Sequence, residues 1–148
     1  MGMDVYGKKN PEAYFRASVW TWHPLWDVCC LVSPELTDQV THGHSNVGDG
    51  LNEADSIRLA NRLLTALASG DVARIIETEL RRQSQLVDDD CTYCQKTGRR
   101  QWPEGERECN VCQGRGHHRP DDTHHHTTTE EVRRFIVFLD TCGGFEIR

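Results

Sequence analysis

Two pairs of cysteines constrain this chain more than any other feature of its sequence. Cys91 and Cys94 form one Cys-x-x-Cys knuckle, and Cys109 and Cys112 form a second. The intervening residues 95–108 are long enough to make a hairpin that brings the four thiolates together. Such a set completes the tetrahedral shell of a structural Zn²⁺, with Zn–S bonds of about 2.3 Å and no open position for water. The spacing therefore predicts one structural zinc ion and argues against hydrolysis assisted by that ion.

Disulfides or a redox-active dithiol are the alternatives for these cysteines. The amino-terminal residues lack the apolar segment of a secretory signal, and no stretch reaches the roughly 18 apolar residues of a membrane span. We therefore expect a reducing, cytoplasmic setting, which favours zinc. In that setting Cys29, Cys30 and Cys142 are expected to be small buried hydrophobic residues, with a reactive thiol as the alternative.

Glycines follow both knuckles at fixed distances. Residues 109–116 match the pattern C-x-x-C-x-G-x-G, and residues 91–98 match it except that Lys96 replaces the first glycine. Glycine lets the chain turn with positive φ, so that backbone N–H groups point at the sulfurs. This segment resembles the DnaJ-type zinc finger, which implies zinc. DnaJ-like proteins carry four such repeats and a J domain with a His-Pro-Asp tripeptide. This chain has two repeats, and Leu25 follows its His-Pro pair, so a complete DnaJ-type co-chaperone is not expected.

The chain has 148 residues and a formal net charge of −6. Its length fits one domain with a modest core and an inserted finger, and its charge does not favour a general nucleic-acid-binding surface. Positive side chains nevertheless gather in or beside the finger: Lys96, Arg99, Arg100, Arg107, Arg115, His117, His118 and Arg119. They either offset the charge of roughly −2 on a zinc tetrathiolate or form a phosphate-binding patch.

The first half of the chain reads as short strands followed by helices. A strand is expected at 4–6, and a strand or extended arm at 18–22, where Val19, Thr21 and His23 alternate with tryptophans. Pro24 then suits the first position of a helix, which ends by Ser33-Pro34. Its apolar face comprises Leu25, Val28, Cys29 and Val32.

Two further helices are predicted after a structured loop at 41–50. Asn52 is placed to cap the first, which ends at Ser69-Gly70, and Asp71 to cap the second, which extends to about Gln85. We expect these two helices to pack together.

A last helix and strand follow the polar linker 117–127. Thr128 and Glu131 have the spacing of a capping box, and Gly143-Gly144 ends the helix that it starts. The closing strand 145–147 can lie beside the amino-terminal strand. The resulting prediction is a mostly helical α+β fold with an inserted zinc-ribbon-like hairpin. Its parts are a core over 1–90, the hairpin insertion over 91–116, and a helix and strand over 128–148 that complete the core.

Histidines and carboxylates outside the finger suggest a second metal site. The candidates are His42, His44, Asp49 and the triplet 124–126, because imidazole and carboxylate suit Zn²⁺, Ni²⁺ or Fe²⁺. The alternative is a pair of polar loops that bind no metal.

Three tryptophans lie close together in the sequence: Trp20, Trp22 and Trp26. Such a cluster either packs in the core or forms a stacking wall for a nucleobase or a protein partner. In the second interpretation His23 and the loop through Asp49 form the polar rim of a pocket.

Catalytic motifs are missing from the sequence. It has no G-x-S-x-G elbow, Walker loop, H-E-x-x-H or zinc-deaminase signature. We therefore expect a non-enzymatic protein, with a nucleophile at Cys29 or Cys142 as the alternative.

Segments outside the finger, at 1–8, 18–26, 48–51 and 138–147, resemble a group of small uncharacterised proteins carried by bacteriophages and bacterial genomes. This chain departs from that group at His23, where the group often has arginine. The resemblance implies a mobile-element origin. It suggests docking on a host protein, such as a CRISPR nuclease or another bacterial immune effector, with Arg99 and Arg100 in the docking surface. The alternatives are a pocket that sequesters a small nucleotide and an enzyme that acts on one. No oligomeric state is predicted.

Overall fold

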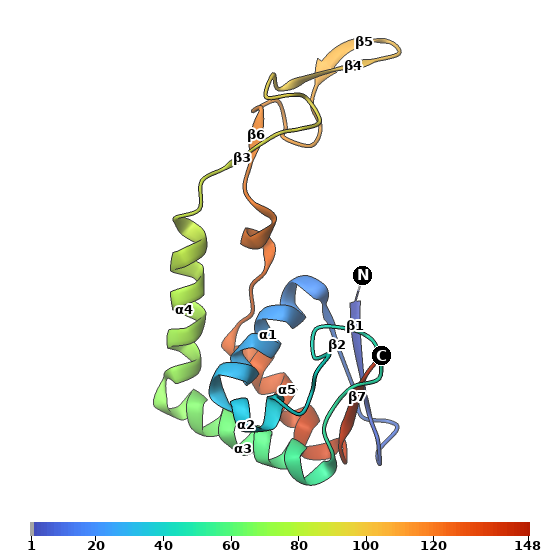
Figure 1. Ribbon diagram of the computed structural model, residues 1–148, viewed down its shortest axis with the longest axis vertical. Helices are drawn as coiled ribbons and strands as arrows, with labels where there is room; N and C mark the ends of the chain where they lie inside the picture. Colours follow the sequence, from blue (N-terminus) through green and yellow to red (C-terminus); the bar gives the residue numbers. More distant parts are fainter. Residues whose placement is uncertain (1) are drawn as a thin grey trace. The chain divides into compact units, whose positions relative to one another are not determined.

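The structure, a computed structural model, describes residues 2–148 and confirms the α+β class (Figure 1). The chain divides into two compact units. We call residues 2–80 and 125–148 the body, and residues 81–124 the zinc unit. The zinc unit extends beyond the predicted insertion on both sides, because the Arg119 guanidinium donates to the Gln83 and Leu86 carbonyls at 2.7 Å and thereby ties the two flanking segments together.

The helices and strands are divided between the two units. The body contains β1 (Gly2–Gly7), β2 (Tyr14–Ser18), α1 (Val19–Val32), α2 (Pro34–Thr37), α3 (Glu53–Ser69), most of α4 (Asp71–Ser84), α5 (Thr129–Thr141) and β7 (Phe145–Ile147). The zinc unit contains β3 (Asp89–Asp90), β4 (Arg99–Trp102), β5 (Gly105–Glu108), β6 (His117–His118) and the 3₁₀ turn η1 (Asp121–His124).

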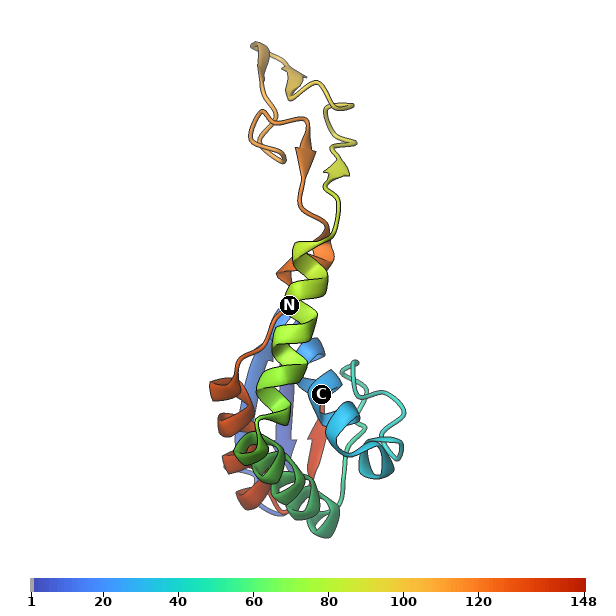
Figure 2. The same cartoon turned by 90° about the vertical axis from the view of Figure 1, so that its left-hand side faces the viewer.

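The body has one antiparallel sheet with the strand order β2-β1-β7. Val5 pairs with Phe15 on one side and with Ile147 on the other, and all three side chains point into the core. This register confirms that the closing strand lies beside the amino-terminal one. Helices α1 and α5 cover the inner face of the sheet (Figures 1 and 2).

The expected strand at 18–22 is wrong, because α1 already begins at Val19. Ser18 caps it by accepting a hydrogen bond from the Thr21 N–H at 3.2 Å, so the cap outweighs the alternating pattern. Pro24 consequently lies inside the helix. A proline has no N–H for the Trp20 carbonyl one turn earlier, and that carbonyl instead accepts from the His126 N–H at 3.1 Å. The proline thus leaves an acceptor that anchors the segment leading into α5.

Two other predicted caps agree with the structure, whereas the predicted cap Asp71 lies within α4 as its first residue, where its carboxylate accepts from the Arg74 guanidinium. The Asn52 side chain accepts from the Asp55 N–H at 2.9 Å, and Thr128 accepts from the Glu131 N–H at 3.2 Å. Gly70 ends α3 with a φ of 84°. At this left-handed residue α4 leaves α3 at a steep angle, so α3 packs against α5 and α1 and the predicted pairing of α3 with α4 is wrong (Figure 1).

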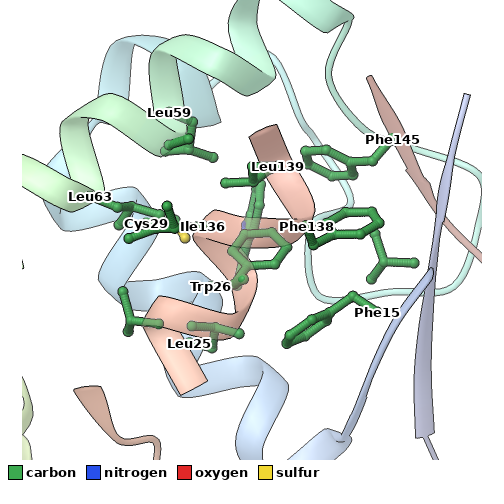
Figure 3. Close-up of a cluster of buried hydrophobic side chains, with 14 of the residues drawn as sticks. Phe15, Leu25, Trp26, Cys29, Leu59, Leu63, Ile136, Phe138, Leu139 and Phe145 are labelled. Carbon is green, nitrogen blue, oxygen red and sulfur yellow. The ribbon is translucent and has the colours of Figure 1, made fainter. Parts of the chain in front are cut away.

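The core of the body lies between the helices and the sheet (Figure 3). Each large side chain that is fully buried there contributes about 1.5–3 kcal/mol through removal of its surface from water. The core residues labelled in Figure 3 are Phe15, Leu25, Trp26, Cys29, Leu59, Leu63, Ile136, Phe138, Leu139 and Phe145.

Candidate metal centre and binding surfaces

The four predicted ligands meet in the zinc unit. All four cysteines are buried, and their sulfurs lie within 4.8 Å of one another. The Cys91 and Cys109 sulfurs are 3.8 Å apart, and those of Cys94 and Cys112 are 3.7 Å apart. Tetrahedral zinc with Zn–S bonds of about 2.3 Å requires S···S separations of about 3.8 Å. The cluster therefore fits one structural Zn²⁺ with a closed four-sulfur shell.

The two knuckles make equivalent backbone hydrogen bonds to each other. The Cys91 N–H donates to the Gly116 carbonyl at 2.9 Å, and the Cys109 N–H donates to the Gly98 carbonyl at 2.8 Å. Each knuckle is thus fixed by the glycine that ends the other one. The ligand set is consequently assembled by reciprocal contacts between the two repeats.

Lys96 occupies the position at which the other repeat has Gly114. Both residues are left-handed, with φ of 69° and 77°, and both backbone N–H groups donate at 3.1 Å to the carbonyl of the first cysteine of their knuckle. A left-handed residue with a Cβ costs about 1–2 kcal/mol. The lysine therefore preserves the turn geometry at a modest energetic cost.

Gly98 and Gly116 fulfil a stricter requirement. Their φ angles are 74° and 81°, and a Cβ on either would lie only 2.1 or 2.2 Å from a backbone oxygen of the opposite knuckle. Their N–H groups point at sulfurs, with N···S distances of 3.3 Å to Cys94 and 3.2 Å to Cys112. These donors stabilise negative charge on the thiolates, as expected for groups around a metal shell.

The thiols differ in how readily they ionise. Burial raises the pKa of Cys91 to about 11. For Cys109, burial is outweighed by the backbone N–H groups of Cys112 and Val111, which lower the pKa to about 7. The Cys109 thiol thus has the lower pKa of the two. Because the thiols must release protons, zinc affinity falls as the solution becomes acidic.

The β4–β5 hairpin sorts its side chains onto two different faces. Arg100 pairs with Arg107 and Trp102 with Gly105, so these residues share one face. The Arg100 guanidinium lies 5.2 Å from the centroid of the Trp102 ring and 5.6 Å from that of Tyr93. The two rings are 36% and 63% exposed, respectively. We call Tyr93, Arg100 and Trp102 the aromatic face.

The opposite face of the hairpin is charged and self-paired. Arg99 donates to Glu106 at 3.0 Å. Ion pairs also join other cations of the zinc unit to carboxylates, as in Lys96–Asp90, Arg107–Glu104 and Arg119–Asp88. Such pairing reduces the net positive charge that these side chains can offer to a phosphate.

The tryptophans do not line the expected pocket. Trp22 is fully buried, its indole N–H donates to the Gly43 carbonyl at 2.8 Å, and its ring stacks on Trp26. A Cβ on Gly43 would lie 2.0 Å from the Trp26 ring nitrogen, so the 41–50 loop is pressed against both indoles. Core packing is therefore the correct interpretation for Trp22. Trp20 is 43% exposed and contacts the His125 ring.

The 41–50 loop is held by its own polar side chains. Asp49 accepts from the His42 and Gly50 N–H groups, each at 2.9 Å, and these bonds lower the pKa of its carboxyl. His44 bonds Asp27 at 2.9 Å, and the His23 ring nitrogen lies 3.3 Å from the His44 carbonyl oxygen. Each of these predicted site residues thus has a structural partner.

The predicted second metal site is not assembled. Within residues 2–148, the four cysteines are the one group of metal-ligating side chains found close enough together to hold an ion. His42 contacts Asp49, His44 contacts Asp27, and His125 lies against the rings of Trp20 and His23. The structure therefore does not gather the 41–50 loop and the histidine triplet, which the sequence left open as a second site, into one group of ligand atoms.

Tyr93 and Trp102 are surface residues that the sequence did not identify. The sequence did not single out either residue as a candidate for a binding surface. A finger of this size has no hydrophobic core in which to bury them. Apart from the four cysteines, no apolar cluster is formed in the zinc unit. An aromatic residue in such a unit must remain near its surface, and that was the available signal.

The comparisons with known proteins gave no match among family models, curated proteins or solved structures. Within residues 2–148, no helix combines the length and apolar character needed to cross a membrane.

Proposed function

We propose that this protein is a non-enzymatic binding protein whose zinc-stabilised hairpin docks onto a partner protein. The observation that supports this is the aromatic face, where Arg100 lies between two exposed rings. Tyrosine, tryptophan and arginine dominate the energetics of protein interfaces, because they bury large areas and still make directed polar contacts. The zinc cluster stabilises the hairpin without an open coordination position, so its role is structural.

A protein partner suits the charge of this region better than a nucleic acid does. Three arginine or lysine side chains of the hairpin and its flanks are paired with carboxylates, and the whole chain carries −6. Polyanion binding depends on a surplus of unpaired cations, and these ion pairs leave few of them on the hairpin. Among the ion pairs of residues 2–148 none joins Arg100 to a carboxylate, and its guanidinium donates a hydrogen bond to the Asn110 amide oxygen, at 3.4 Å. We infer that it pairs with a carboxylate of the partner.

The resemblance to phage and bacterial proteins extends the proposal to the partner's identity. We propose a host protein, for which a nuclease effector of a bacterial immune system is the first candidate to test. Tight occupation of a basic groove by an acidic protein would exclude the nucleic acid substrate.

Variants of the two hairpin faces test the docking proposal against candidate effectors by biolayer interferometry. Trp102→Ala and Arg100→Ala should each weaken binding at least about tenfold, as is typical of interface hot spots. Arg99→Ala is the matched control on the opposite face and should change affinity less than about twofold. Zinc content and the melting curve should be unchanged in all three. Equal effects on both faces, or none, would refute docking through the aromatic face.

A further inference from the structure

The outer face of the body sheet carries exposed aromatic and charged side chains. Alternation along the strands points Met3, Val5 and Phe15 into the core, and places Tyr6 and Tyr14 on the opposite face. These tyrosines are 39% and 47% exposed. The face belongs wholly to the body and is separate from the aromatic face of the zinc unit.

The two tyrosines form an ordered pair. Tyr6 and Tyr14 are direct cross-strand partners, and their ring centroids lie 5.1 Å apart. The Tyr14 hydroxyl donates to the Asp4 carboxylate, which also lies 3.5 Å from Arg16. These contacts hold the rings in place before any ligand arrives. Exposed rings that are held in this way provide a stacking surface for a planar group.

A pocket lies directly beside this pair. Its volume is about 310 Å³, at the lower end of the range for small-molecule sites. It is lined by Tyr6, Gly7, Lys8, Pro11, Glu146 and Arg148. A ligand of this size that reached Tyr6 would therefore also contact the charged side chains at its rim.

The charges around the pocket favour an anion. The Arg148 guanidinium bonds the Glu146 carboxylate at 2.6 and 2.9 Å and lies 6.0 Å from the Tyr6 ring centroid. Lys8 lines the same pocket, and among the ion pairs of residues 2–148 none involves its ammonium group. Lys8 is therefore the cation of the pocket lining whose charge is available to a ligand.

We propose that this pocket binds a nucleoside monophosphate. The base stacks on Tyr6 and extends toward Tyr14, while Lys8 and Arg148 contact the phosphate. Stacking and ion pairing act on different parts of the ligand, so each can be removed separately. This inference does not depend on the docking proposal. It places the nucleotide contact on the outer face of the sheet, whereas the sequence had suggested the tryptophans.

Isothermal titration with adenosine 5′-monophosphate at low salt tests the proposal. We expect saturable binding with a Kd of about 0.1 mM, and weaker binding by adenosine and by ribose 5-phosphate, each of which offers only one half of the recognised chemistry. Binding of the monophosphate should weaken as salt screens its charge.

Two neighbouring lysines provide a matched comparison. Lys8→Gln should weaken binding of the monophosphate about tenfold and leave binding of adenosine unchanged. Lys9→Gln, which removes a lysine paired with Glu53 outside the pocket lining, should affect neither ligand. Tyr6→Leu should weaken both ligands, provided that its melting curve matches the parent.

The proposal would be overturned by an absence of saturable binding to the parent protein up to about 5 mM. Equal losses in the two lysine variants would overturn it as well, since they would indicate non-specific attraction to positive charge. The lysine comparison decides the question even if Tyr6→Leu does not fold.

Discussion

Gly116→Ala should disrupt the zinc centre more than its matched control Gly114→Ala, although neither residue is a ligand. Both residues are left-handed, with φ of 81° and 77°. A Cβ on Gly114 would meet only the Glu108 side chain, at 3.3 Å, and that flexible side chain can move. A Cβ on Gly116 would lie 2.2 Å from the Lys96 backbone oxygen, in the opposite knuckle. Gly114→Ala therefore adds conformational strain alone, whereas Gly116→Ala also forces the knuckles apart.

The two costs can be estimated separately. Strain at a left-handed residue is about 1–2 kcal/mol, and Lys96 already tolerates it at the equivalent position. Forcing backbone atoms apart in a packed site adds about 1–3 kcal/mol, and the displaced Gly116 N–H also loses its bond to the Cys112 sulfur. We expect zinc affinity to fall about tenfold in Gly114→Ala and at least about 100-fold in Gly116→Ala.

Competition with a chromophoric chelator measures both affinities, and thermal unfolding with and without chelator reports the coupled loss of stability. Equal zinc affinities for the two variants would refute the reasoning, because they would show that the close approach of Gly116 to the opposite knuckle does not hold the ligands in place.

Further predictions concern the body. Trp22→Phe should destabilise the body by about 1–3 kcal/mol in chemical denaturation, because the Gly43 carbonyl loses its buried donor. Trp20→Phe, at a half-exposed position, should destabilise it by less than about 0.5 kcal/mol. Similar losses of stability in the two variants would contradict the assigned burial. NMR titration should show the pKa of His44 above its ordinary value, because of its hydrogen bond to Asp27, and the pKa of His23 below its ordinary value, because of burial. The stabilisation from the His44–Asp27 contact is therefore fully present below the unfolded pKa of His44 and is lost as pH rises through its folded pKa; Asp27→Asn should lower that pKa, and an unchanged value would exclude the contact.

Local signals in the sequence predicted the zinc ligands and most helix ends. The knuckle spacing determines which sulfurs can meet. Caps such as Asn52 and Thr128 act through hydrogen bonds between residues only three positions apart in the sequence. The strand predicted at 18–22 failed because two local signals competed. Alternation favoured a strand, but the Ser18 cap and the burial of Trp22 against Gly43 stabilise a helix. The second of these contacts spans 21 residues, so no local pattern reveals it.

The candidate surfaces depend on contacts that the sequence alone left open. Arg100 was a candidate, and alternation along β4 puts it on the same face as Trp102, but its contact with Tyr93 joins the hairpin to the first knuckle and has no local signal. In the same way, Tyr6 and Tyr14 become neighbours only through the pairing of β1 with β2. A shift of one residue in that pairing would place the two tyrosines on opposite faces of the sheet.

X-ray absorption at the zinc edge, on protein isolated with its metal, tests the central claim most directly. The account predicts one zinc per chain with four sulfur neighbours at about 2.3 Å and no nitrogen or oxygen in the first shell. Cys112→Ser should abolish that signal and unfold the hairpin. A shell that contains nitrogen or oxygen ligands, or an unchanged spectrum in Cys112→Ser, would contradict it.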